Sequence, residues 1–199
     1  MLPRRRLYLL NMPPKMHCMQ RTITLAFYRP TPGENRVNDL TARWSEHGMC
    51  HVELVFDGMW AFSLYLTEPT RLRQKSFLNP GYEMVSLSVP YMEYASCLQF
   101  CKAAAKEAYP IDKAGMYLSM IHPGGCMEVS SASIGKTFCS KIITEALKFG
   151  GLQETQGLSP SAVTPSRLYA AVKDSERRIC HNVRPLAGTG VLVPLMMRQ

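Results

Sequence analysis

The sequence lacks any apolar run of 18 or more residues, and charged residues make up only 19% of its 199 positions. The first absence argues against a membrane-spanning helix. The low charge, together with a hydrophobic content of 46%, argues against wholesale disorder. Internal repeats and low-complexity tracts are also missing. A chain of this length and composition predicts a globular protein with a single folded domain.

Acidic residues are scarce at both ends of the sequence. Residues 1–29 contain none, and residues 173–199 hold two acids against five bases. The stretch between them, 30–172, carries 12 bases and 13 acids, although the whole chain has a formal charge of +8. The folded body is therefore expected to be nearly neutral, with a partner that need not be anionic. Only the basic ends suit nucleic acid or an acidic lipid surface.

We also expect no secretory signal. Arg4-Arg5-Arg6 precedes an apolar run of only four residues, and Pro13-Pro14 follows soon after. We therefore expect an intracellular protein, most simply cytoplasmic, although the Arg-rich and acid-free start also suits a mitochondrial presequence. Prolines and sparse apolar periodicity at both ends set the expected boundaries. These are a flexible basic extension at 1–18, a domain at 19–184 and a tail at 185–199.

The seven cysteines include no C-x-x-C pair and are odd in number, so we expect reduced thiols rather than a disulfide framework. Cys97 and Cys101 are four residues apart on an expected helix, and three further cysteines each have a histidine neighbour. Structural zinc sites use shorter, paired ligand spacings. We therefore predict no metal and no cofactor, and expect Cys97 and Cys101 to be small core residues.

Hydrophobic periodicity predicts an α+β domain rather than repeated βαβ units. Asp57-Gly58 between two apolar alternating runs indicates a tight hairpin turn. Thr137 is expected to cap one helix, and Pro165 to open the last one. The expected strands are 20–28, 51–56, 59–66 and 82–89; the expected helices are 38–46, 91–108, 137–149 and 165–173; and 109–136 is expected to be a long loop.

Cys139 is the best candidate for a nucleophile. If Thr137 caps the helix, Cys139 falls near its second position, where unpaired N–H groups and the helix dipole favour a thiolate. His51 begins a strand expected to lie inside an antiparallel sheet, from which an imidazole can face a helix N-terminus. We expect Cys139 to be the most acidic thiol of the chain. His122 is a second, lower-ranked candidate for the base.

Three segments together resemble a known family. They are Cys50-His51-Val-Glu-Leu-Val-Phe before a hairpin, Tyr109-Pro-Ile-Asp112 with Gly115, and Thr137-Phe-Cys-Ser-Lys-Ile-Ile-Thr-Glu-Ala-Leu147. This ordered pattern resembles the circularly permuted branch of the NlpC/papain-like thiol enzymes, which includes lecithin:retinol acyltransferase-like proteins and bacterial and large-DNA-virus relatives. The resemblance implies a papain-like fold whose antiparallel sheet carries the histidine and whose central helix starts with the cysteine. It also implies acyl-cysteine chemistry on an ester, thioester or amide.

The family has a third polar residue, on the strand after the histidine, that orients the imidazole. It is typically His, Glu, Asn or Gln. Here the expected strand 59–66 offers only Ser63 and Tyr65 as side chains with a polar oxygen, so this sequence departs from the usual choice. An uncharged serine would stabilise an imidazolium less well than a carboxylate would.

The register of the hairpin decides which group meets the histidine. A two-residue Asp57-Gly58 turn would pair His51 with Leu64, and we expect a loop one residue longer to pair it with Ser63. Glu53, two residues from His51 on the same strand face, is the competing carboxylate. We favour Ser63, because a residue on the neighbouring strand can approach the imidazole edge-on.

Tyr109 and Asp112 fall where the resembling enzymes have a loop beside the catalytic cysteine. They are candidate substrate-binding residues, and the alternative is that they are ordinary turn residues.

These observations predict a cysteine-dependent hydrolase or acyltransferase acting on an acyl or peptide-like substrate. Cys139 would be the nucleophile and His51 the general base and then acid, with Ser63 or Glu53 orienting the imidazole. The alternative is a catalytically inactive papain-like interaction module, whose basic ends bind nucleic acid or an acidic membrane surface.

Overall fold

The structure, a computed structural model, describes residues 19–33, 36–43, 45–121, 135–175 and 177–179. Within them the chain forms a five-stranded antiparallel sheet and several helices, so the expected α+β class is confirmed. In chain order the elements are β1 (Gln20–Tyr28), α1 (Arg36–Arg43), β2 (His51–Phe56), β3 (Trp60–Tyr65), β4 (Glu68–Gln74), β5 (Tyr82–Pro90), α2 (Tyr91–Glu107), α3 (Lys113–Ile121), α4 (Cys139–Gly150), the 3₁₀ turns η3 (Gln153–Thr155) and η4 (Pro160–Ala162), and α5 (Pro165–Lys173).

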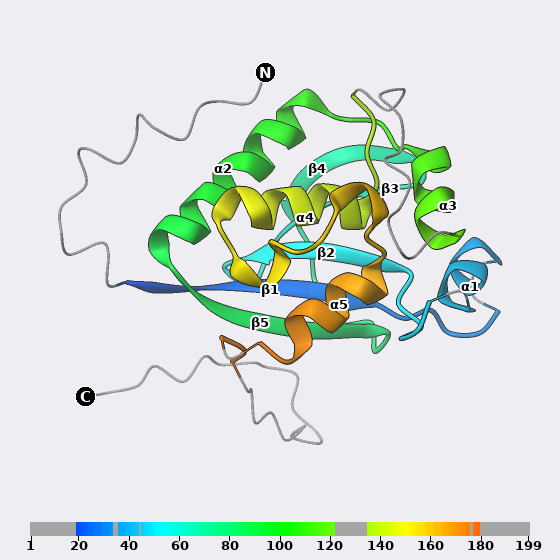
Figure 1. Cartoon of the computed structure of the whole chain (residues 1–199), viewed down its shortest axis with the longest axis horizontal. Helices are drawn as coiled ribbons and strands as arrows, with labels where there is room; N and C mark the ends of the chain where they lie inside the picture. The colour runs from blue at the N-terminus through cyan, green and yellow to red at the C-terminus, as the bar shows by residue number, and fades with distance from the viewer. Residues whose placement is uncertain (1–18, 34–35, 44, 122–134, 176, 180–199) are drawn as a thin grey trace.

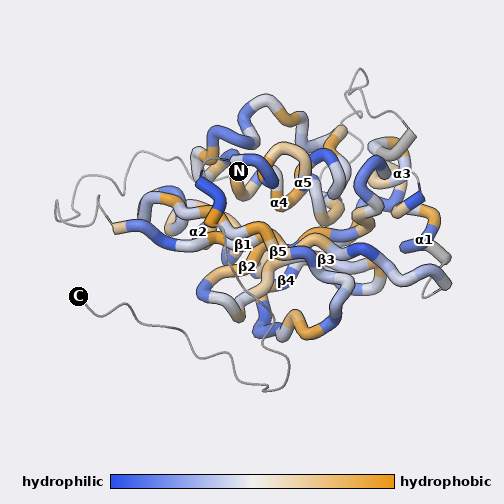
Figure 2. The backbone as a smooth tube through the Cα atoms, turned by 90° about the horizontal axis from the view of Figure 1, so that it is seen from below, coloured by the Kyte–Doolittle hydropathy of each residue, from blue (hydrophilic) through white to orange (hydrophobic). Residues whose placement is uncertain are grey.

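The sheet has the strand order β4-β3-β2-β1-β5. Helices α2, α4 and α5 cover one face, as the two perpendicular views show (Figures 1 and 2). Alternation along β1 places Ile23, Leu25 and Phe27 in the core beneath these helices, each fully buried. Helix α4 contributes its own apolar stripe, including Ile143 and Leu147, to the same core. The sheet and α4 together therefore form the rigid frame of the molecule.

Besides the short 3₁₀ turns, one strand and one α-helix were not expected from the sequence. Strand β4 was missed because it is polar, with Pro69 and two arginines, which is typical of an edge strand. Helix α3 lies inside the segment predicted to be a loop, and Asp112 begins it by accepting a hydrogen bond from the Gly115 N–H at 2.9 Å. The remaining expected strands and helices are present with small shifts at their ends.

The hairpin between β2 and β3 has a longer turn than expected. Asp57 and Gly58 adopt positive φ angles of 51° and 71°, as a primed turn requires. The ladder, however, starts with Phe56 opposite Trp60, so Met59 also belongs to the turn. The predicted two-residue connection was wrong by one residue, which changes the partner of His51.

The expected extensions at 1–18 and 185–199 lie outside the described residues. Residues 122–134 do as well, and with them the candidate base His122. At the C-terminal end of the described residues, 177–179 pair with the free edge of β5. The Ser88 N–H donates to the Arg177 carbonyl at 2.8 Å, and the Ile179 N–H donates to the Ser86 carbonyl at 2.8 Å. This short segment therefore belongs to the sheet.

Candidate active site

Cys139 is the first residue of α4. Phe138, in extended conformation, occupies the N-cap position and makes no side-chain capping bond, so the prediction that Thr137 caps the helix was wrong. Thr137 instead pairs with the segment before α3. Its N–H donates to the Pro110 carbonyl, and its carbonyl accepts from the Asp112 N–H. This bridge fixes the chain immediately before α4 and thereby positions the cysteine.

Backbone N–H groups surround the Cys139 sulfur. Those of Cys139 and Ser140 come from the helix N-terminus, and that of Val52 comes from β2; each lowers the pKa of the thiol. Burial outweighs them, because the residue is only 9% exposed, and raises the pKa to about 11. The pKa therefore lies above that of a free cysteine, so the prediction that the helix N-terminus favours a thiolate here was wrong. Cys139 nevertheless has a lower pKa than Cys97, which burial raises to about 12.

Val52 can reach the sulfur because β2 and β3 separate at this end of the sheet. Their paired residues run only from Phe56 to Leu54 on β2, opposite Trp60 to Phe62 on β3. The Val52 N–H faces Cys139, and the Val52 carbonyl accepts a hydrogen bond from Ser63 Oγ at 2.9 Å. The opening of the ladder thus brings α4 into contact with the backbone next to His51.

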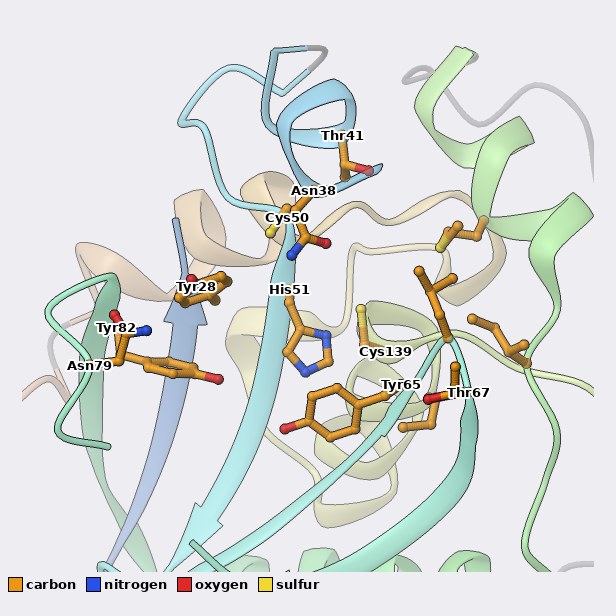
Figure 3. Close-up of a pocket in the computed structure, with 14 residues that line it drawn as sticks. Tyr28, Asn38, Thr41, Cys50, His51, Tyr65, Thr67, Asn79, Tyr82 and Cys139 are labelled. Atoms are coloured by element: carbon orange, nitrogen blue, oxygen red, sulfur yellow. The ribbon is translucent and has the colours of Figure 1, made fainter. Parts of the chain in front are cut away.

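His51 begins β2, and both His51 and Cys139 line one cavity (Figure 3). Figure 3 shows the imidazole beside Cys139, with Nδ1 on the cysteine side. Its Nε2 lies 3.5 Å from Ser63 Oγ and 3.7 Å from Glu53 Oε1. Burial lowers the pKa of His51 to about 4, against the opposing effect of Glu53. The resting site therefore holds a neutral thiol and a neutral imidazole.

The two groups near Nε2 fix the tautomer of His51. Glu53 is a carboxylate, and the Ser63 hydroxyl hydrogen is donated to the Val52 carbonyl, so both present an acceptor to the ring. Nε2 therefore carries the proton and Nδ1 holds the lone pair. The Nδ1 lone pair lies on the Cys139 side of the ring, where the imidazole can act as the base for the thiol proton.

Both expected orienting residues thus approach the histidine, and neither is directly opposite it. Continuing the observed register puts Tyr65 opposite His51, and their ring centroids are 4.7 Å apart. The expectation that a longer loop would pair His51 with Ser63 was wrong, because each added loop residue moves the partner toward the C-terminus. Ser63 reaches Nε2 from a diagonal position.

Glu53 is the centre of a polar network on the sheet face opposite α4. It is 1% exposed and accepts hydrogen bonds from Tyr65 Oη at 2.7 Å and Tyr82 Oη at 2.9 Å, and it forms an ion pair with Lys75. Burial alone would raise its pKa, but His51, Lys75 and Tyr65 together lower it. Glu53 therefore carries a negative charge that is largely compensated by Lys75.

The cavity at Cys139 has a volume of about 450 Å³. Its wall includes Ile111, which precedes Asp112, and Met116, whose N–H donates to the Asp112 carbonyl, but neither of the two expected substrate-binding residues. Asp112 is buried and caps α3, and the Tyr109 N–H donates to Thr70 Oγ1 at 2.8 Å. The segment around Tyr109 and Asp112 thus reaches the cavity, but through the side chains of Ile111 and Met116.

Lys75 and Tyr82 were not anticipated as parts of the site. Both lie far from His51 in the sequence, on the segment between β4 and β5 and at the start of β5, and they meet Glu53 only through the sheet order. No spacing motif links them. Tyr65 was noted only as a polar side chain on its strand, and its position opposite His51 depends on the turn length.

The chain matches no protein-family model and no curated protein. In the part of the chain that the structure describes, no three His, Cys, Asp or Glu side chains gather in a group that could hold a metal ion. Over the same residues, no helix is both long and apolar enough to span a bilayer. Cys50, Cys97, Cys101 and Cys139 form no disulfide bond.

Proposed function

We propose that the protein is a cysteine-dependent hydrolase or acyltransferase of papain-like architecture, with Cys139 as nucleophile and His51 as general base and then acid. One observation carries this proposal: a thiol at a helix N-terminus and a histidine with its Nδ1 lone pair on the thiol side line the same cavity. A cysteine that served only in packing would not need a histidine and three backbone N–H groups around it.

The proposed reaction starts from the neutral pair. Sγ attacks the carbonyl carbon of an ester, thioester or amide while Nδ1 of His51 takes the thiol proton. The oxyanion is held by backbone N–H groups at the site, for which Cys139 and Val52 are the available donors. Collapse expels the leaving group, which takes the proton from the imidazolium and leaves an acyl thioester on Sγ. Water or another acceptor then attacks the thioester, again with His51 as base, and the free thiol is restored.

Glu53 supports this cycle through its charge. The imidazolium forms only during the reaction, and the Glu53 carboxylate 3.7 Å from Nε2 then attracts it. Lys75 offsets part of that attraction at rest, which agrees with the low pKa of His51. The third group of the site is therefore a carboxylate already shared with a lysine and two tyrosines.

The second candidate is a papain-like interaction module without turnover. It is favoured by the raised pKa of the Cys139 thiol, since a resting thiolate would have been the clearest sign of a reactive cysteine.

The experiment that separates the two candidates uses p-nitrophenyl acetate. The enzyme is expected to release p-nitrophenolate and to carry an acetyl group on Cys139, detected by intact mass and peptide mapping. Cys139→Ser and His51→Ala should abolish both signals. His47→Ala is the matched control, because His47 packs against Tyr169 outside the cavity and should react like the parent. Acetylation spread over several cysteines, or unaffected by His51→Ala, would contradict the enzyme proposal.

A further inference from the structure

The described part of the cavity wall carries no ionised side chain. Among the described residues that line it there is no Asp, Glu, Lys or Arg, and its one histidine is neutral near pH 7. Two carboxylates that neighbour lining residues are already engaged: Glu53 with Lys75, and Asp112 with the Gly115 N–H at the start of α3. An ionised group placed against the described wall would lose hydration without gaining an opposite charge on that wall, which is costly.

The wall also has two different sides. Apolar side chains come from the end of β3, the residue after it, the segment before α3 and α3 itself, namely Leu64, Leu66, Ile111 and Met116. Polar but uncharged side chains come from α1 and from the loop before β5, including Asn38, Thr41 and Asn79. Figure 3 shows Asn79 and α3 on opposite sides of the catalytic pair, with Asn38 and Thr41 above it.

We propose that the site selects an uncharged acyl substrate, with an apolar group against α3 and the end of β3 and a hydrogen-bonding group against α1 and the loop before β5. This rests on the proposed function, because it assumes that the reacting carbonyl sits between Cys139 and His51. A cavity of about 450 Å³ is within the range that encloses a small molecule or a short segment of a larger one. Apolar surface on one side and amide or hydroxyl groups on the other match such a substrate without any ion pair.

The selection can be measured on Cys139 itself with two alkylating reagents of nearly equal size, neutral iodoacetamide and anionic iodoacetate. In each case a bond forms from Sγ to carbon, the carbon–iodine bond breaks, iodide leaves and the thiol proton is lost. The rate ratio of iodoacetamide to iodoacetate is determined at Cys139 by peptide mapping and divided by the same ratio for glutathione. A third reagent, the 2-bromoethylammonium cation, tests the opposite charge in the same way.

We expect the normalised preference for iodoacetamide to be at least tenfold against either charged reagent. Met116→Lys adds a cation to the wall and should raise the iodoacetate rate several-fold relative to iodoacetamide. Leu66→Lys gives a second test at a more exposed position of the wall. Leu78→Lys is the matched control, because Leu78 is 88% exposed and does not line the cavity.

The outcomes distinguish the two proposals. A normalised ratio within about twofold of that of glutathione, with Cys139 reactive, would overturn the charge selection and leave the thiol enzyme standing. A Cys139 that reacts with none of the reagents would overturn the proposed function, and the charge selection with it. Equal effects of Met116→Lys and Leu78→Lys would show that overall charge, not the cavity wall, controls the ratio and would also overturn the selection.

Discussion

The burial of His51 predicts how the stability of the protein depends on pH. The side chain is 14% exposed, and its pKa falls from an ordinary 6.5 to about 4 on folding. Between these values the unfolded chain binds a proton that the folded protein does not, so acidification favours unfolding. The stabilisation is complete above pH 6.5 and is lost as the pH falls toward 4. A difference of about 2.5 pKa units corresponds to about 3 kcal/mol.

The assay is urea unfolding of the parent and of His51→Gln at intervals from pH 4 to pH 8. Glutamine keeps the approximate size and polarity of the imidazole but does not titrate. The parent should lose about 3 kcal/mol across this range, and His51→Gln should lose far less. Glu53, whose pKa is also lowered, contributes with the same sign at more acidic pH, below about 4.5, and so is separable. Parallel profiles for the two proteins between pH 4.5 and pH 7 would refute the argument from burial.

Other predictions concern packing and the network behind the histidine. Gly150→Ala would place a Cβ 2.2 Å from the Cys97 sulfur, so the free energy of unfolding should fall by about 1–3 kcal/mol, measured by urea denaturation, whereas Gly157→Ala, with no neighbour within 4 Å, should be nearly neutral. A Cys97→Ala change in the Gly150→Ala background should restore part of the loss. Glu53→Gln leaves the half-buried Lys75 ammonium without its carboxylate and should cost on the order of 3 kcal/mol together with most of the Cys139 acylation rate. Ser63→Ala should slow acylation by about tenfold or less, and a larger loss would show that the serine, not the carboxylate, orients the imidazole.

Much of the fold could be predicted because local patterns and long-range packing agree there. Strand β1 was predicted with its observed bounds from alternation alone, and α5 from Thr164 and Pro165, where Thr164 Oγ1 accepts from the Arg167 N–H at 3.2 Å. Strand β4 carries no such alternation of apolar residues, and its pairing with β3 comes from sheet position. Edge strands are therefore the elements that the sequence pattern describes least well.

The site was predictable only in part, for a similar reason. Cys139 and His51 each begin a regular element, and such positions can be recognised from helix-start and strand-start patterns. Their protonation states could not be predicted from these patterns, because burial, rather than the helix terminus, dominates the pKa of the thiol. The partners of Glu53 depend on the strand order, which no local pattern contains.

The most direct test of the Cys139–His51 pair is the pH profile of Cys139 alkylation by iodoacetamide. With a pKa of about 11, roughly one thiol in ten thousand is ionised at pH 7, which is about 300-fold fewer than for an unperturbed thiol with a pKa near 8.5. The higher nucleophilicity of a more basic thiolate offsets only about tenfold of that deficit. Rapid reaction at neutral pH therefore requires a base that removes the proton.

The measurement is the rate at Cys139 from pH 5 to pH 9, in the parent, His51→Ala and the control His47→Ala. The pair predicts a nearly flat profile for the parent and for His47→Ala, because His51 is unprotonated and the thiol un-ionised throughout this range. For His51→Ala it predicts a rate at pH 7 lower by at least tenfold that rises about tenfold per pH unit, as expected for a reaction through the thiolate alone. A parent profile that rises with pH as steeply as that of His51→Ala, and with the same rates, would contradict the account.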